Sequence, residues 1–181
     1  MIEPGLINDI IKQTITEGHW LVLIVRGTSM TPFLKENDRV VVQPIGFQEI
    51  GLGDVIAFRN HDVIFTHRVI QKKGDYLITK GDNCVLSDPV LSEEYVLGKV
   101  VALERNGQQV QLSRKIEIVN VFLGYCHRVV GMVGQISQTA LRLTRGRYRR
   151  LFSMMTRSLI IVVHLMERIL LYGSRIEKSN P

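Results

Sequence analysis

Cysteine is scarce in this 181-residue sequence, which contains only Cys84 and Cys126. The two residues are far apart, and neither lies in a spacing that is typical of metal ligands. A disulfide between them stays open, but a reducing compartment is the simpler expectation. We find no cofactor motif, and we expect neither a metal ion nor a cofactor.

Long hydrophobic runs are also absent. The two most apolar stretches, residues 116–133 and 159–171, are each interrupted by charged residues and histidine. Neither supplies the roughly 20 apolar residues that a membrane-spanning helix needs. The N-terminal region lacks the apolar segment of a secretory signal peptide. We therefore expect a protein that is cytoplasmic or peripherally associated with a membrane.

Acidic residues are missing from one part of the chain. The net charge is +6, but residues 142–157 contain six arginines and no Asp or Glu. This excess favours an anionic partner, and acidic lipid headgroups and nucleic acid are the candidates. The alternative is a helix face that contacts only water.

Short β-type runs fill most of the first 113 residues. Before them, apolar residues at helical spacing between Leu6 and Ile15 predict a short amphipathic helix that ends near Gly18. Asn60-His61-Asp62, Lys73-Gly74-Asp75 and Asn106-Gly107 predict hairpin turns between strands. The predicted strands cover residues 21–25, 40–42, 54–59, 63–71, 76–79, 96–104 and 110–112.

The β-type pattern stops after Ser113. Residues 114 to about 175 contain no proline and are rich in long apolar and arginine side chains, which predicts two or three helices. The chain thus divides into an N-terminal amphipathic helix (1–18), a β domain (19–113) and a basic helical C-terminal extension (114–181). The predicted fold class is mainly β, an antiparallel sheet or partial barrel with an α-helical extension.

The segment 27–32, Gly-Thr-Ser-Met-Thr-Pro, has the features of a loop that presents a nucleophile. A serine hydroxyl is a weak nucleophile unless its position is fixed and a base removes its proton. Gly27 allows a tight turn before Ser29, and Pro32 stiffens the chain after it. Taken alone, the segment could equally be an ordinary loop between two strands.

Further motifs follow this serine in a definite order. They are Gly53-Asp54-Val55-Ile56-Ala57-Phe58, Thr66-His67-Arg68-Val69-Ile70, Thr79-Lys80-Gly81-Asp82-Asn83 and Gly98-Lys99-Val100. Together with S-M-x-P, this order over residues 20–104 resembles the type I signal peptidases. The resemblance is closer to the branch of the endoplasmic reticulum, archaea and some spore-formers, in which histidine replaces the lysine of the usual bacterial enzymes. It implies a coiled all-β core, in agreement with the strand prediction.

The resemblance also implies roles for four residues. Ser29 matches the nucleophile and His67 the general base, Asp88 matches the acid that completes the triad, and Asp82 matches a second acidic position of the same motif. A neutral imidazole can accept the serine proton near pH 7, and a carboxylate fixes its tautomer. Asp82 in Lys-Gly-Asp-Asn also suits a turn, so the choice of the triad acid stays open.

Other expected site residues surround the serine. The backbone N–H of Ser29, with help from the Thr28 hydroxyl, is expected to stabilise the oxyanion, and Met30 and Pro32 are expected to contact the substrate. Lys80 and Lys99 are the nearest lysines for a serine–lysine dyad, but neither aligns with the lysine of the bacterial enzymes.

The sequence departs from the family pattern in three ways. Gly27 stands where signal peptidases usually have a serine whose hydroxyl helps to hold the oxyanion, and Thr28 replaces the following glycine. Before the nucleophile, where the family usually has a membrane anchor, we expect a short amphipathic helix instead. The arginine-rich extension has no counterpart that we can name. These departures favour a dedicated maturation peptidase that cuts leader or signal-like peptides over general removal of secretory signals.

Two other functions remain as alternatives. A self-cleaving repressor of the same superfamily would share the β fold, but it would use lysine as its base and would need an N-terminal DNA-binding domain. Only about twenty residues precede the β domain, too few for a helix-turn-helix domain, so nucleic acid is not the expected partner. A non-catalytic peptide-binding module is the second alternative. The expected partners are a peptide or preprotein substrate and an anionic membrane surface contacted by the helical extension.

Overall fold

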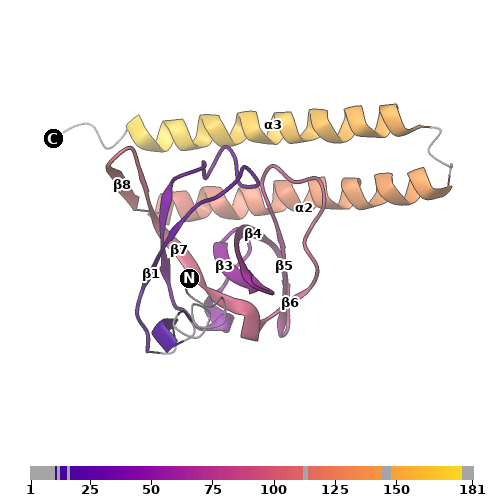
Figure 1. The fold of residues 1–181 in the computed structure, drawn as a ribbon. Coiled ribbons are helices and arrows are strands. Elements are labelled where there is room, and N and C mark those ends of the chain that lie inside the picture. The colour runs from indigo at the N-terminus through magenta and orange to yellow at the C-terminus, as the bar shows by residue number, and fades with distance from the viewer. Residues whose placement is uncertain (1–10, 12, 16, 112–113, 144–147, 177–181) are drawn as a thin grey trace, which may run out of the picture.

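A computed structural model describes residues 11, 13–15, 17–111, 114–143 and 148–176 of the chain. It contains a coiled antiparallel β-sheet and a pair of long antiparallel helices that run past one side of it (Figure 1). The predicted class, a mainly β fold with an α-helical C-terminal extension, is confirmed. The sheet is open rather than closed into a barrel.

The sheet has eight strands, and its order is β1-β2-β7-β3-β4-β5-β6, with β8 paired to β7. All of its pairs are antiparallel, and β1 lies at one edge. The strands are β1 (Leu21–Ile24), β2 (Arg39–Gln43), β3 (Val55–Asn60), β4 (Val63–Lys73), β5 (Tyr76–Lys80), β6 (Leu91–Ser92), β7 (Val96–Arg105) and β8 (Gln108–Gln111). Two short 3-10 helices, η1 (Phe47–Glu49) and η2 (Glu93–Tyr95), lie between strands.

The three predicted turns all join antiparallel neighbours. Asn106 and Gly107 connect β7 to β8 and both have positive φ, 52° and 74°. This backbone suits the right-handed twist of a tight hairpin, and Asn and Gly adopt it at low cost. His61 (φ 53°) and Gly74 (φ 55°) occupy the other two turns. The turn residues therefore set the register of the hairpins.

Two apolar clusters fill the β part. The first includes Met30, Phe33 and Leu34 from the loop after β1, packed on Val40 and Val100 from the sheet. Such burial anchors the loop that carries Ser29, because each fully buried large apolar side chain is worth about 2 kcal/mol. The second cluster gathers Phe47, Ile50, Ile56, Phe58, Val69, Leu77 and Leu91.

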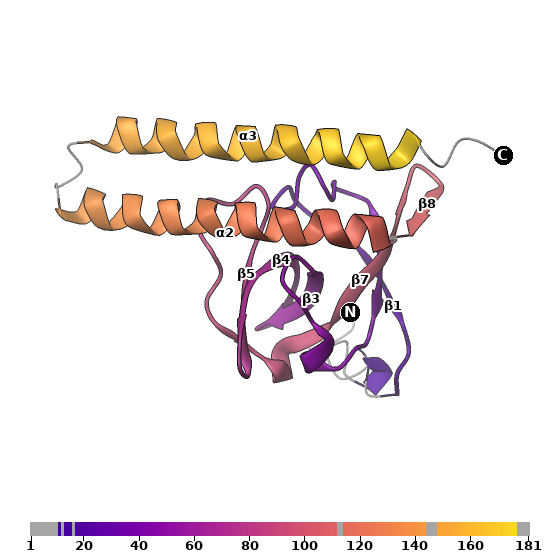
Figure 2. The same cartoon turned by 180° about the vertical axis from the view of Figure 1, so that it is seen from behind.

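The helices α2 (Arg114–Leu143) and α3 (Arg149–Ile176) form an antiparallel hairpin (Figure 2). Helix α2 packs on β4, and it packs closely because glycines face the β part. A methyl group on Gly124 would lie 2.8 Å from the Cα of Gly53, and one on Gly134 would lie 2.7 Å from the carbonyl oxygen of Val85. Val130 of α2 and Ile160 and Val163 of α3 form the apolar contact between the two helices.

One strand was missed by the sequence predictions, and one predicted helix is described only in part. Strand β6 was not predicted, since its two residues are too few to show alternation. The predicted N-terminal helix over 1–18 lies mostly outside the described residues, although residues 11 and 13–15 are helical.

Candidate functional site

Ser29 lies in the loop between β1 and β2, and the loop is fixed at both sides of it. Before Ser29, Gly27 adopts a φ of +80°, which is left-handed backbone that favours glycine. After it, Met30 and Pro32 are buried in the core. The carbonyl oxygen of Ser29 accepts a 2.8 Å hydrogen bond from the backbone N–H of Asn83. The loop is therefore attached to the segment that follows β5.

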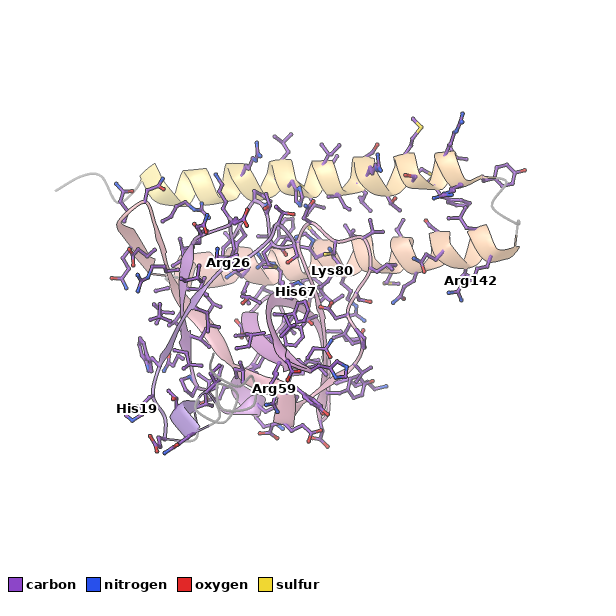
Figure 3. The ribbon with its side chains drawn as sticks, in the orientation of Figure 1. His19, Arg26, Arg59, His67, Lys80 and Arg142 are labelled. Carbon is purple, nitrogen blue, oxygen red and sulfur yellow. The ribbon has the colours of Figure 1, made fainter. Side chains whose placement is uncertain are left out.

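His67 lies in the middle of β4, opposite Ile56 of β3, and its side chain is buried. Phe58 and Phe65 contact its ring, with centroids 5.9 and 5.7 Å away. These contacts, made by the neighbouring strand β3 and by β4 itself, restrict how the imidazole can turn. Figure 3 shows His67 within the β part, below the helical hairpin.

A continuous series of polar contacts joins Ser29 to Asp88. The Oγ of Ser29 lies 3.0 Å from the Nε2 of His67, and the Nδ1 of His67 lies 2.7 Å from the Oδ2 of Asp88. The Thr79 hydroxyl donates a second hydrogen bond to the same Oδ2 atom, at 2.7 Å. The backbone N–H of Asp88 in turn donates to the Thr79 carbonyl oxygen at 2.8 Å. Strand β5 thus positions the carboxylate that meets the imidazole.

Gly81 is a site residue that the sequence analysis did not identify. A methyl group at this position would lie 2.7 Å from the Ser29 carbonyl oxygen, 2.8 Å from the Cys84 Sγ and 3.1 Å from the Nε2 of His67. Only glycine allows this approach. Thr79 was also missed as a site residue, although both residues belong to the Thr-Lys-Gly-Asp-Asn motif that was quoted for its order alone.

Asp82 takes a different position from Asp88. It is fully buried, and its two carboxylate oxygens accept hydrogen bonds from Nε and Nη2 of Arg68 at 2.9 and 2.8 Å. Burial raises a carboxyl pKa, but Arg68, with His127 and Lys80, outweighs it and lowers the pKa of Asp82 to about 2. Of the two candidate acids, Asp88 contacts His67, whereas Asp82 forms an ion pair beneath the helices.

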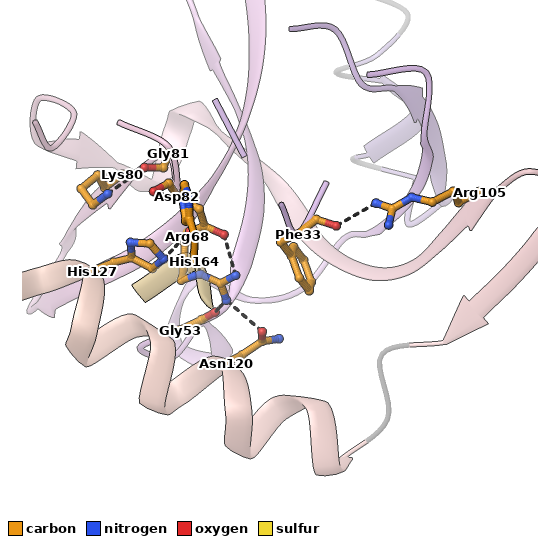
Figure 4. Close-up of polar contacts among 10 residues, drawn as sticks. All are labelled: Phe33, Gly53, Arg68, Lys80, Gly81, Asp82, Arg105, Asn120, His127 and His164. Carbon is orange, nitrogen blue, oxygen red and sulfur yellow. Dashed lines mark hydrogen bonds and ion pairs between the residues drawn. The ribbon is translucent and has the colours of Figure 1, made fainter. Parts of the chain in front are cut away.

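Arg68 is the centre of that buried cluster (Figure 4). Its Nη1 donates to the Gly53 carbonyl oxygen at 3.1 Å and to the Oδ1 of Asn120 on α2 at 2.8 Å. Its guanidinium lies over the ring of Phe33, 4.9 Å from the centroid. Arg68 therefore connects the Ser29 loop, the segment after β5 and helix α2.

Each helix of the hairpin also places a histidine beside Asp82. The Nε2 of His127 on α2 lies 3.3 Å from Oδ1, although without hydrogen-bond geometry, and His164 Nε2 on α3 lies 3.1 Å from the Asp82 carbonyl oxygen. Burial lowers the pKa of His127 to about 3 and also lowers that of His164. Both imidazoles are therefore neutral near pH 7.

The two lysines that could have formed a serine–lysine dyad have other partners. Lys80 Nζ donates to the carbonyl oxygens of Gly81 and Cys84 at 2.8 and 2.6 Å, and burial lowers the pKa of Lys80 to about 8. Lys99 Nζ forms an ion pair with Asp54 Oδ1 at 2.8 Å.

The remaining predicted site residues lie in the loop around Ser29. Thr28 is exposed, and within the described part of the chain the backbone N–H of Ser29 donates no hydrogen bond. The expected substrate contacts of Met30 and Pro32 are corrected, because both side chains are buried and Met30 is only 2% exposed. Their burial in the core holds the loop that carries Ser29.

The described residues (11, 13–15, 17–111, 114–143 and 148–176) include neither a metal-ligand cluster nor a helix that could span a membrane. No group of three or more His, Cys, Asp or Glu side chains in these ranges is placed to hold a metal ion. None of the helices described here is long and apolar enough to span a bilayer.

Among curated proteins, the chain is similar to the "Inactive signal peptidase IA" of Staphylococcus aureus strains Mu50, N315 and MW2, in each case with 26% identity over 80 residues. The match covers 43% of this chain and 46% of each relative, so the chain spans about half the length of these proteins. The model of the Peptidase S24-like family matches residues 7–101, more than half of the chain. The chain therefore belongs to the Peptidase S24-like family.

Proposed function

We propose that this protein is a serine endopeptidase in which Ser29 is the nucleophile, His67 the general base and Asp88 the acid that orients the base. The observation that carries the proposal is the series of two contacts, 3.0 Å from Ser29 to His67 and 2.7 Å from His67 to Asp88. Both distances lie within the range over which a nucleophile, its base and the orienting acid act together.

The mechanism follows from the atoms that face each other. As the Ser29 Oγ attacks the carbonyl carbon of the scissile peptide, its proton passes to the Nε2 of His67. The Asp88 carboxylate accepts the Nδ1–H hydrogen bond and stabilises the imidazolium, and Thr79 holds that carboxylate in place. His67 then gives the proton to the leaving amine. In the second half-reaction water attacks the acyl-enzyme with the same base.

The oxyanion is assigned to the backbone N–H of Ser29 and the exposed hydroxyl of Thr28. A donor that is fixed before the reaction stabilises the developing negative charge without reorganisation, and one such donor is worth about 3 kcal/mol. The fixed loop around Ser29 meets this requirement, because Asn83 and the buried Met30 hold it on either side.

The substrate in this proposal is an extended leader or signal-like peptide. Strand β1 lies at the sheet edge and ends five residues before Ser29, so a peptide that adds to this edge would pass the hydroxyl. A pocket of about 140 Å³ lies beside Asp88 and offers room for one apolar side chain of the peptide. Its lining comprises the apolar and aromatic residues Phe58, Phe65, Pro89, Val90, Leu91 and Tyr95 and the polar residues Arg59, Asn60 and Asp88.

Within the superfamily, we assign the chain to the branch that uses histidine as the base. The support is that His67 contacts Ser29, whereas Lys80 and Lys99 are bonded elsewhere. The same contacts disfavour the lysine-based mechanism of a self-cleaving repressor.

A non-catalytic peptide-binding role is the second candidate, and one observation favours it. The matched relatives of Staphylococcus aureus carry the name of an inactive signal peptidase. Against this role, Ser29, His67 and Asp88 are all present in this chain and make the contacts that the reaction needs.

The two functions are distinguished by incubating the protein with a library of extended peptides and detecting products by mass spectrometry. A peptidase cleaves some of them, and Ser29→Ala and His67→Ala each remove nearly all cleavage. The double variant should be little worse than either single variant, because the two side chains act as one unit. Peptide binding without cleavage, or equal cleavage by Ser29→Ala, would contradict the proposal.

A further inference from the structure

Helix α2 carries an exposed apolar stripe along the side that faces away from the β part. Its members follow one another at intervals of four and three residues, which places them on one side of an α-helix. The opposite side carries Leu123, His127 and Val130, which are buried. The stripe consists of Ile118, Phe122, Tyr125, Val129, Met132 and Ile136, and every member is exposed.

Helix α3 has a similar arc. Its buried positions Thr156, Ile160 and Val163 face α2 or the β part. The opposite side carries Leu151, Met154, Met155, Ile161, Val162 and Leu165, all exposed. Isolated exposed apolar residues are ordinary, but twelve exposed apolar side chains on the outer sides of two packed helices indicate an interaction surface, which we call the patch.

The charges beside these arcs have a single sign where their exposure is described. Arg150, Arg157 and Arg168 lie along one edge of the α3 arc, at intervals of seven and eleven residues, and α2 adds the exposed Arg128 and Arg142. In the sequence, residues 114–176 contain eleven basic and two acidic residues. The patch is therefore apolar in its centre and cationic along its edge.

We propose that the α2–α3 hairpin is a docking surface for an anionic lipid bilayer, on which both helices lie in the plane of the interface. An apolar helix side can enter the boundary between headgroups and acyl chains, while arginines extend to the phosphates. Within their described residues, neither helix is long and apolar enough to span a bilayer, which agrees with a surface position. A second copy of the chain is a poor occupant, because two such cationic faces repel each other.

The arrangement of the hairpin fits this role. The buried side of α2 carries His127, Asn120 and Val130, and it attaches the helix to the β part and to α3. Docking through the exposed side therefore needs no rearrangement of the fold.

Sedimentation with vesicles tests the proposal on the full chain. The protein should sediment with vesicles of phosphatidylglycerol and phosphatidylcholine, but weakly with phosphatidylcholine alone, and high salt should reduce binding to the anionic vesicles. Arg157→Gln with Arg168→Gln should weaken that binding by roughly 25-fold, about fivefold for each arginine. Val129→Asp should weaken it by roughly tenfold or more, because it removes apolar contact and adds a negative charge.

The controls are matched in exposure and chemistry. Val63 in the β3–β4 hairpin is 54% exposed and Val129 is 52% exposed, so Val63→Asp makes the same change outside the patch. Lys35→Gln with Lys73→Gln removes two exposed charges from the β part. Both controls should bind like the unaltered protein, and circular dichroism melting should show that all variants remain folded.

Three results would overturn the proposal. They are absence of sedimentation with anionic vesicles, equal binding to neutral and anionic vesicles, and unchanged binding by the Val129 and double arginine variants. A dimer in solution that Val129→Asp abolishes would assign the face to a second copy of the chain instead.

Discussion

A methyl group on Gly81 would lie 2.7 Å from the carbonyl oxygen of Ser29 and 3.1 Å from the Nε2 of His67. The first distance is shorter than a Cβ and a carbonyl oxygen can tolerate, and both partners are held by their neighbours. Gly81→Ala must therefore displace Ser29, His67 or both. Since shifts of about 1 Å in reacting groups can reduce rates by about 100-fold, we expect a loss of peptide cleavage of that order.

The control for this variant is Gly131→Ala on helix α2. A methyl group there meets only ordinary contacts, 3.6 Å to Ile70 Cδ1 and 3.7 Å to Lys80 Cδ. It should leave cleavage unchanged and stabilise the helix by about 0.5–1 kcal/mol. If Gly81→Ala cleaves as fast as the unaltered protein, the close approach has no role in positioning Ser29.

Thr79→Val tests the hydrogen bond that holds Asp88. Valine keeps the shape of the side chain but removes the hydroxyl that donates to Asp88 Oδ2 at 2.7 Å. We expect kcat to fall by roughly tenfold, the loss of about one hydrogen bond to a charged group, while KM changes little. Steady-state kinetics would show this split, and Thr66→Val on β4 serves as the control. A change in KM alone would mean that Thr79 acts on substrate binding instead.

Asp88→Asn should lose catalytic activity, whereas Asp82→Asn should lose stability. Asp88 contacts His67, so its amide variant should lose about 10⁴ in kcat, since an amide cannot stabilise the imidazolium, and should keep its stability. Asp82 is paired with the fully buried Arg68, and removing one partner of such a pair costs about 3–5 kcal/mol of unfolding free energy. Urea unfolding and cleavage rates measure the two effects, and the reverse pattern would exchange the two roles.

The stability of the fold should decrease on acidification because of His127. Burial lowers its pKa to about 3 in the folded chain, whereas an unfolded histidine titrates near 6.5. Between these values the unfolded state binds more protons, so the free energy of unfolding falls as the pH drops below about 6.5. Of the groups around it, Asp82 raises the pKa of His127, whereas Lys80, Arg68 and His164 lower it further.

One such histidine contributes at most about 1.4 kcal/mol per pH unit. Urea unfolding between pH 7 and pH 5 would show the slope, and His127→Gln should reduce it. His19→Gln should not, because the His19 side chain is 70% exposed. An unchanged slope in His127→Gln would mean that His127 is protonated in the folded chain. Below about pH 4, Asp82 also reduces the free energy of unfolding. Its pKa is lowered from 3.8 to about 2 in the folded chain, so the unfolded state again binds more protons.

Local chemistry made most of the β part predictable from the sequence. Alternating β-branched runs and turn residues such as Asn106-Gly107 specify hairpins through neighbours in the chain. Ser29, His67 and Asp88 were predicted as site residues because the motif order resembles a known family. The two-residue strand β6 had no pattern to detect.

The unpredicted features depend on contacts between distant segments. Nothing in the sequence around Arg68 or Asp82 indicates a buried ion pair that also meets Asn120 on α2, which is 52 positions after Arg68 in the chain. The closeness of Gly81 to Ser29 likewise arises only when β5 and the loop after β1 meet. For the same reason, Met30 and Pro32 could not be recognised as core residues from their place beside the serine.

The most direct test of the peptidase proposal is labelling with a fluorophosphonate, followed by mass spectrometry of the modified peptide. Such a probe reacts with a serine whose proton is removed by a neighbouring base. We predict one modified residue, Ser29, with labelling that is nearly lost in His67→Ala. Modification of another serine, or equal labelling of Ser29 without His67, would contradict the account.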